Sequence, residues 1–218
     1  MNNSFGVIFD MDGVLVDSNP KHKESLNLFF REHNKEISED FLEKKIFGRT
    51  NTEWIREVFG DIPNETALQI AHDKESLFRD IFNPKEEMVP GLKEFLNMVK
   101  EKGTKLAVAT SAPVENVDFI LSELSIKDHF DVILDSSHVT TGKPDPEIYL
   151  KTSRALGFSP DRCIVFEDSL AGVESARRAK ARVIGITTTH TPEELSDCDK
   201  IIDSFENLTL EDLSALFD

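Results

Sequence analysis

The sequence lacks several features that mark particular classes of protein. It has 2 cysteines in 218 residues, Cys163 and Cys198, and their spacing fits neither a metal-binding nor a redox motif. We therefore expect free thiols, as in a reducing compartment. Apolar runs are short, and the first, Phe5–Phe9, is neither long enough to span a membrane nor preceded by the basic segment of a signal peptide. These absences predict a cytoplasmic protein that makes no membrane contact.

Positive charge is also scarce. Lys and Arg number 25 against 41 Asp and Glu, which gives a formal charge of −16. Because such a chain repels the phosphate backbone, we expect no nucleic-acid partner. An anionic substrate would need a metal ion or well-placed cations in its site to overcome the same repulsion. Hydrophobic residues at 39% and charged residues at 30% are typical of a globular protein.

Short apolar runs followed by polar turns predict the strands of a sheet. Runs that are apolar at nearly every position are typical of parallel strands covered by helices on both faces. Helical patterns separate most of these runs, and this alternation predicts an α/β fold, a Rossmann-like, doubly wound parallel sheet. The clear runs are Val7–Phe9, Leu106–Ala109, Val132–Leu134 and Ile164–Phe166, and the weaker ones are Val183–Ile186 and Ile201–Ile202.

Residues 17–87 interrupt this alternation, because they hold helical patterns and no convincing strand. The gap predicts an inserted small α-helical cap domain at 17–87, with an α/β catalytic core made of 1–16 and 88–218. Because open α/β sheets bind ligands at the carboxyl ends of their strands, an insertion directly after the first strand is well placed to act as a lid.

The strongest chemical signal is the pair of acids Asp10 and Asp12 after the first strand, with Gly13 allowing the chain to turn. Close carboxylates repel each other, and Mg²⁺, a hard cation that takes oxygen ligands, relieves that repulsion. One carboxylate can then act as a nucleophile while its neighbour moves a proton. Taken alone, the pattern also fits an acidic turn in which Asp17 caps a helix.

Three further groups of polar residues follow later strands. Thr110 and Ser111 can hold a phosphoryl oxygen or cap the next helix. Lys143 can neutralise a carboxylate and a phosphate, although a lysine in a turn is usually solvated. Glu167 and Asp168 can ligate a metal ion or favour a helix start. Because all lie at or beyond the carboxyl ends of predicted strands, their coincidence indicates one shared site.

Together these segments resemble the four motifs of the haloacid dehalogenase-like hydrolase superfamily. The stretches FDMDGVLVDS, ATSA, GKPDPEIY and FEDSLAGVESA occur in the expected order, and the resemblance spans nearly the whole chain. Within that group the sequence is most similar to the β-phosphoglucomutase-like sugar phosphatases. The resemblance implies a Mg²⁺-dependent phosphatase that hydrolyses small phosphomonoesters, sugar phosphates among them, through an aspartyl-phosphate. We also expect a monomer whose partner is a small-molecule phosphate.

The resemblance implies a role for each motif residue. Asp10 would be the nucleophile, and Asp12 would protonate the leaving oxygen and then activate the hydrolytic water. Lys143 would bridge Asp10 and the transferring phosphoryl group. The substrate's phosphoryl group and its surroundings would be bound by Thr110, Ser111 and Ala112.

Mg²⁺ is the implied cofactor. Its ligands would be the carboxylates of Asp10 and Asp168, the backbone carbonyl of Asp12, and Glu167 directly or through water. The family's strand order would place the first strand between the second and the fourth, which brings Asp10, Thr110 and the later acids together. Such a set supplies the positioning and charge neutralisation on which phosphoryl transfer depends.

Substrate selectivity is expected from the cap. By resemblance, His22 matches a hinge-side histidine, Gly48, Arg49 and Asn51 match a substrate loop, and Lys74 matches a cap lysine. The mutases carry an Arg where this chain has Asn51, whereas Arg49 follows Gly48 directly. A mutase must hold a bisphosphate by both phosphates, and an Asn supplies no charge. The departure therefore favours a phosphatase over a mutase.

Other functions stay open. The first alternative is a β-phosphoglucomutase, and the second is an inorganic pyrophosphatase, since Arg49 and Lys74 can hold a second phosphoryl group. A phospho-acceptor receiver domain would be shorter, with its acceptor after the third strand and no cap. A silent binding module would have lost one of the motif acids or Lys143, all of which are present.

Overall fold

The computed structural model describes residues 5–33, 35, 37–38, 41–42, 46 and 51–218, apart from the side chains of residues 52 and 53. The chain divides into two compact units, one of Met1–Asp17 with Pro84–Asp218 and the other of Ser18–Asn83. These limits differ from the expected insertion at 17–87 by one residue at its start and four at its end.

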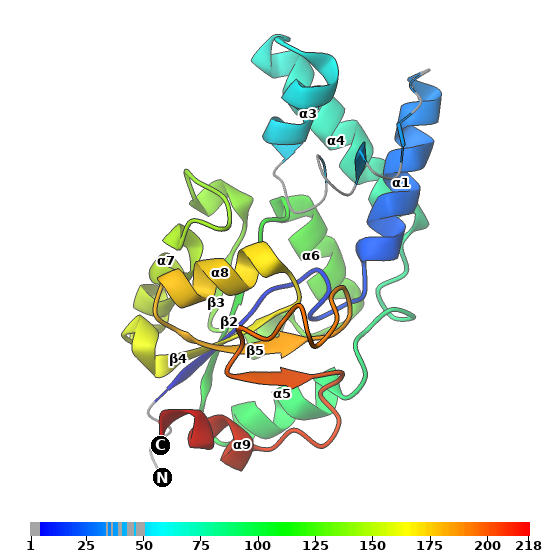
Figure 1. Ribbon diagram of the computed structural model, residues 1–218. Helices are drawn as coiled ribbons and strands as arrows, with labels where there is room; N and C mark the ends of the chain where they lie inside the picture. The colour runs from blue at the N-terminus through cyan, green and yellow to red at the C-terminus, as the bar shows by residue number, and fades with distance from the viewer. Residues whose placement is uncertain (1–4, 34, 36, 39–40, 43–45, 47–50) are drawn as a thin grey trace. The chain divides into compact units, whose positions relative to one another are not determined.

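The larger unit is built on a parallel sheet. Within its described residues, six strands pair in the order β3-β2-β1-β4-β5-β6 (Figure 1). This sheet confirms the predicted α/β fold, and β1 lies between β2 and β4, as the family resemblance implies. The strands are β1 (Gly6–Phe9), β2 (Lys105–Ala109), β3 (Val132–Leu134), β4 (Cys163–Glu167), β5 (Arg182–Ile186) and β6 (Lys200–Ile202).

Helices cover both faces of this sheet, as Figure 1 shows for α8 and α5. The α-helices of this unit are α5 (Leu92–Glu101), α6 (Val114–Glu123), α7 (Glu147–Leu156), α8 (Leu170–Arg178) and α9 (Leu210–Ser214). Short 3-10 helices occur at Lys127–His129, Ser136–His138, Pro160–Arg162 and Ala215–Phe217.

Neighbouring residues of β1 show how the two faces are filled. Ile8 belongs to a buried cluster that includes Ile148 of α7 and Val173 of α8. Phe9 points to the other face, since successive strand side chains alternate. There its ring stacks on Phe166 with centroids 5.0 Å apart and meets Phe95 of α5 edge-on at 6.3 Å. The central strands are therefore apolar throughout because both of their faces are buried.

The strand register fixes where each polar segment begins. Phe9 of β1 pairs with Phe166 of β4 and with Val108 of β2. The next residue, Asp10, donates its backbone N–H to the Phe166 carbonyl at 3.0 Å. Likewise, Thr110 donates its backbone N–H to the Leu134 carbonyl of β3 at 3.0 Å. The polar residues after β1, β2 and β4 therefore start at one edge of the sheet.

The smaller unit is helical over its described residues, with α1 (Asn19–Glu32), α3 (Asn51–Phe59) and α4 (Asn64–Ile81). Its buried cluster contains Phe29, Phe30 and Trp54, whose rings meet edge-on. Trp54 is 2% exposed, so its ring lies in the interior of this unit. The apolar faces of these helices thus give the unit a core of its own.

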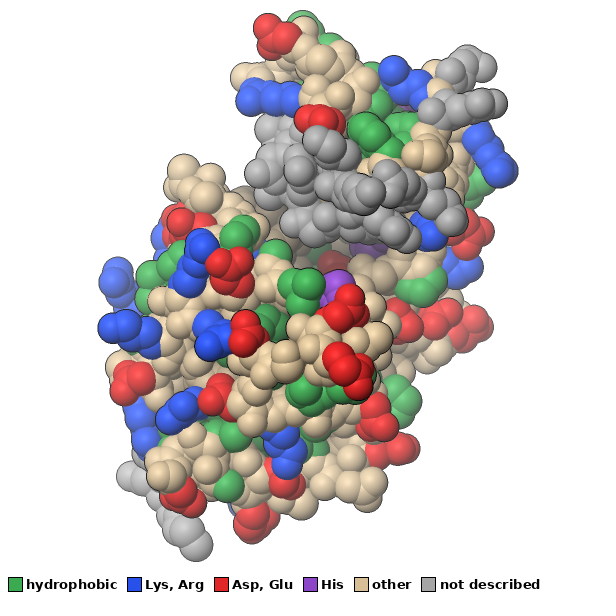
Figure 2. All heavy atoms as spheres, viewed as in Figure 1, with side chains coloured by type: hydrophobic (Ala, Val, Ile, Leu, Met, Phe, Trp, Pro, Cys, Tyr) green, Lys and Arg blue, Asp and Glu red, His purple; other side chains and the backbone are tan. Residues whose placement is uncertain are grey.

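Charged side chains of both signs are interspersed on the face drawn in Figure 2. Among the described helices, none is both long and apolar enough to cross a bilayer. Cys163 and Cys198 are free thiols, and burial raises the pKa of each to about 11.

Candidate functional site

Three acids gather at the carboxyl edge of the sheet. Asp10 follows β1, Glu167 ends β4, and Asp168 comes next. One carboxylate oxygen from each lies within 4.8 Å of the others. All three are buried, with Glu167 at 0% exposure. We call Asp10, Glu167 and Asp168 the acid trio. Since buried like charges repel strongly, an ionised trio requires positive charge between its members.

Lys143 supplies part of that charge. Its Nζ donates to Asp10 Oδ1 at 2.7 Å and to Glu167 Oε1 at 2.6 Å. The lysine side chain is 8% exposed. Although burial lowers the pKa of Lys143, the attraction of Asp10 and Glu167 raises it well above its usual value. The side chain is therefore a permanent cation between two of the three acids.

A single lysine does not balance the trio. Burial, opposed by Lys143 and reinforced by Glu167 and Asp12, raises the pKa of Asp10 from 3.8 to about 7. Burial together with Glu167 and Asp10 raises the pKa of Asp168 well above its usual value. Burial and neighbouring negative charge therefore disfavour the ionised forms of both acids. A divalent cation bound by hard oxygen ligands would remove this penalty, so the donor set fits such an ion.

Glu167 is held by donors on both of its carboxylate oxygens. Tyr149 of α7 donates its hydroxyl to Oε1 at 2.5 Å, beside Lys143. The backbone N–H groups of Asp168 and Ser169 donate to Oε2 at 3.2 Å each, and the Ser169 hydroxyl donates at 3.0 Å. These donors fix the carboxylate that anchors Lys143.

The turn after β1 needs a glycine. Gly13 has a φ of +76°, and a Cβ placed there would lie 2.0 Å from Asp168 Oδ2. The missing side chain therefore lets the β1 turn approach the acid that follows β4. Asp12, half-buried in this turn, affects the pKa of Asp10 but is not one of the described carboxylates that form the trio. Its ligation through the backbone carbonyl stays a prediction.

The segment after β2 is built around Thr110, which is 1% exposed. The Thr110 hydroxyl oxygen accepts from the Ala112 backbone N–H at 3.0 Å, which leaves its hydrogen to donate to another group. Ala112 is buried and Ser111 is exposed. This places the three predicted substrate-binding residues beside the strand that carries Asp10.

Within the smaller unit, three predicted residues form one polar cluster, in which Lys74 is buried and His22 and Asn51 are half-buried. Lys74 Nζ lies 3.0 Å from His22 Nδ1 and 2.9 Å from Glu75 Oε1. Asn51 donates its amide N–H to Glu75 Oε1 at 2.9 Å, while its carbonyl accepts from the Trp54 indole at 2.8 Å. Although burial raises the pKa of Glu75, Lys74, His22 and Asn51 hold it at about 2. Lys74 is thus paired with an ionised acid.

The predicted residues Gly48 and Arg49 lie outside the described residues. Glu75 and Tyr149 were not predicted as site residues from the sequence. Glu75 stands directly after the predicted Lys74, and Tyr149 lies within the GKPDPEIY stretch, and these positions are the only sequence signals for them.

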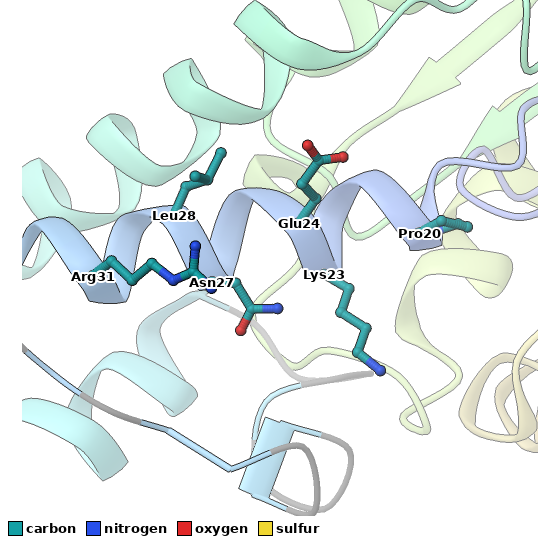
Figure 3. A pocket seen from close by; sticks show the side chains of 6 residues that line it. All are labelled: Pro20, Lys23, Glu24, Asn27, Leu28 and Arg31. Atoms are coloured by element: carbon teal, nitrogen blue, oxygen red, sulfur yellow. The ribbon is translucent and has the colours of Figure 1, made fainter.

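Two surface hollows of the described chain are lined by residues other than the acid trio. One runs along α1, where Figure 3 shows the side chains of Lys23, Asn27 and Arg31 spread along the helix. Another lies beside β6 and includes Thr187 and Asp203. Neither hollow includes a residue of the acid trio or Lys143 among its lining residues.

Comparisons with known proteins agree with this geometry. A family model described as haloacid dehalogenase-like hydrolase matches residues 7–186. A phosphorylated carbohydrates phosphatase from Thermotoga maritima is 36% identical over 186 residues, which cover 83% of this chain and 84% of that protein. A β-phosphoglucomutase from Bacillus subtilis is 28% identical over 94% of this chain and 92% of its own.

A crystal structure from Entamoeba histolytica, described as a HAD hydrolase of family IA, variant 3, superposes with a TM-score of 0.88. It is 31% identical, and the match covers 98% of this chain and 99% of that chain.

Proposed function

The chain belongs to the haloacid dehalogenase-like hydrolase family, and we propose that it is a Mg²⁺-dependent phosphatase acting on small phosphomonoesters, with sugar phosphates as the substrate class. The observation that carries the proposal is the buried Asp10 carboxylate, held 2.7 Å from Lys143 within the acid trio. The phosphorylated carbohydrates phosphatase among the relatives supports the same substrate class.

The metal assignment rests on the charge of the site. Asp10 and Asp168, with Glu167 directly or through water and the Asp12 carbonyl, would hold the ion, and all of these are the oxygen ligands that Mg²⁺ prefers. When bound, Mg²⁺ supplies charge that favours the ionised acids and neutralises phosphoryl oxygens. The raised pKa values of Asp10 and Asp168 show that ionising these buried acids costs free energy, and the charge of the ion would offset that cost.

In the proposed reaction, an Asp10 carboxylate oxygen attacks phosphorus while the bond from phosphorus to the ester oxygen breaks. Asp12 gives its proton to that leaving oxygen, so the alcohol departs neutral. A water molecule, losing a proton to Asp12, then attacks the phosphorus of the aspartyl-phosphate. Cleavage of the acyl–phosphate bond restores Asp10 and releases inorganic phosphate.

Two further residues act on the phosphoryl group. Lys143, held by Asp10 and Glu167, offers a fixed cation to the oxygens on which charge accumulates. Thr110 can donate its hydroxyl hydrogen, because its oxygen already accepts from Ala112. We propose that Ser111 contributes at the same segment. Positioning and charge neutralisation are the main sources of rate in phosphoryl transfer, and these groups supply both.

We propose that the helical unit is the cap that selects the substrate, through His22, Asn51 and Lys74 together with Gly48 and Arg49. The Lys74–Glu75 pair and the uncharged Asn51 favour a leaving group without a second phosphate. This supports a phosphatase over a mutase or a pyrophosphatase, although a β-phosphoglucomutase is among the relatives. We also propose that the protein is a monomer located in the cytoplasm, where its two free thiols would stay reduced.

The test is phosphate release with Mg²⁺ from hexose phosphates, pentose phosphates, glycerol phosphates and pyrophosphate, with Asp10→Asn as the blank. Preferential release from one sugar phosphate is the expected result. Release mainly from pyrophosphate would replace the proposal with a pyrophosphatase. No release, but conversion of β-glucose 1-phosphate once a bisphosphate primer is added, would replace it with a mutase.

A further inference from the structure

The loop after β5 bonds to two parts of the candidate site, although it lies outside the four motif stretches. Thr189 donates its hydroxyl to Asp168 Oδ2 at 2.5 Å. Its neighbour Thr188 donates its hydroxyl to the backbone carbonyl of Gly13 at 2.5 Å. One short loop therefore contacts both the acid that follows β4 and the turn that follows β1.

Two contacts converge on Oδ2 of the Asp168 carboxylate. Gly13 approaches so closely that a Cβ there would lie 2.0 Å from this oxygen. The Thr189 hydroxyl donates to the same oxygen. Close packing and a hydrogen bond at one oxygen both restrict rotation of the carboxylate. The Thr188 bond ties that backbone to the same loop, so the two restraints support each other.

We propose that Thr189 is a positioning residue for the metal site, because its hydroxyl orients the Asp168 carboxylate toward the ion. The inference rests on the proposed function, which makes Asp168 a ligand. Groups that hydrogen-bond to metal ligands set ligand orientation, and their removal typically weakens metal binding or activity by about 10- to 100-fold. Thr189 itself does not touch the reacting atoms.

Two substitutions separate the hydroxyl from the rest of the side chain. Thr189→Val keeps the branched shape and removes the donor, whereas Thr189→Ser keeps the donor and removes the methyl group. Because residue 189 is exposed, neither change is expected to disturb the core.

The experiment is a calorimetric titration of each full-length variant with Mg²⁺, together with thermal unfolding in EDTA. Thr189→Val is expected to weaken Mg²⁺ binding by about 10-fold or more, while metal-free unfolding shows a cooperative transition with only the modest loss of stability that the missing donor to buried Asp168 causes. Thr189→Ser is expected to bind within a few-fold of the original chain. The Mg²⁺ concentration that gives the half-maximal phosphatase rate should rise strongly in Thr189→Val and only slightly in Thr189→Ser.

Mg²⁺ binding by Thr189→Val at the original affinity would overturn the inference. Equal losses in the Val and Ser variants would also overturn it, because the hydroxyl would then not be the cause. Failure of the unaltered chain to bind Mg²⁺ is a distinct outcome, which would overturn the proposed metal site and this inference with it.

Discussion

Tyr149 and Lys143 share one oxygen of a buried carboxylate. The Tyr149 hydroxyl lies 2.5 Å from Glu167 Oε1, and Lys143 Nζ lies 2.6 Å from the same atom. The lysine also lies 5.1 Å from the centre of the Tyr149 ring. Burial, with the charge of Glu167, raises the pKa of Tyr149 well above its usual value. The tyrosine therefore stays a donor, and its ring restricts the lysine on which Asp10 depends.

Tyr149→Phe should separate the hydroxyl from the ring. The ring and its packing remain, but Glu167 loses a donor, and an under-satisfied buried acceptor costs about 1–3 kcal/mol. We expect chemical denaturation to give a free energy of unfolding lower by about that amount. We also expect kcat to fall by about 10-fold with little change in KM, because Lys143 acts on the transferring group. Unchanged kcat would show that the hydroxyl does not help to position Lys143.

The turn after β1 shows how an element serves the site. Gly13 and Gly103, two of the left-handed glycines of the larger unit, differ in their surroundings. Gly13 has a φ of +76°, and a Cβ there would clash with Asp168. Gly103 has a φ of +74°, and a Cβ there would meet nothing within 4 Å. A comparison of the two therefore separates backbone strain from steric exclusion of Asp168.

Gly103→Ala is expected to cost about 1–2 kcal/mol of stability, from backbone strain alone, and to keep full activity. Gly13→Ala should cause the same backbone strain and should also displace Asp168. We therefore expect calorimetry to detect no Mg²⁺ binding to this variant, and we expect phosphate release to be nearly abolished. Thermal unfolding of the two variants without metal provides the control for strain. Normal Mg²⁺ affinity in Gly13→Ala would contradict the close approach of the turn to Asp168.

Much of this element structure could be predicted from the sequence. The strands are apolar at almost every position because both faces are buried, as Ile8 and Phe9 illustrate. The motif acids stand at strand ends, where polar residues interrupt an apolar pattern. Thr189 could not be predicted as part of the site, because its contact joins separate segments. Glu75 sits in an ordinary helical pattern, and nothing local marks its bond to Asn51.

The stability of the whole chain should depend on pH and on metal through the acid trio. Burial raises the pKa of Asp10 from 3.8 to about 7, so the folded chain retains a proton that the unfolded chain releases in this range. Stability without metal should therefore fall as pH rises from about 4 to 7, by on the order of a few kcal/mol. Asp168, whose pKa is also raised, acts in the same direction.

Thermal unfolding in EDTA at pH 5 and pH 8 measures this effect. We expect a lower Tm at pH 8, a smaller difference with saturating Mg²⁺, and a smaller difference in metal-free Asp10→Asn. The Asn variant is the matched control, because it keeps the side-chain shape and cannot ionise. A Tm without metal that rises from pH 5 to pH 8 and does not respond to Asp10→Asn would contradict the buried charge excess.

The most direct test of the proposed mechanism is to trap the phosphoryl group on the chain. Asp12→Asn should block attack by water, while p-nitrophenyl phosphate has a leaving group that needs no proton. Mass spectrometry of Asp12→Asn mixed with p-nitrophenyl phosphate and Mg²⁺ should then find one phosphoryl group on Asp10. The double variant Asp10→Asn with Asp12→Asn should carry none. A phosphoryl group on another residue, or none on the chain while the unaltered protein turns over, would contradict the aspartyl-phosphate mechanism.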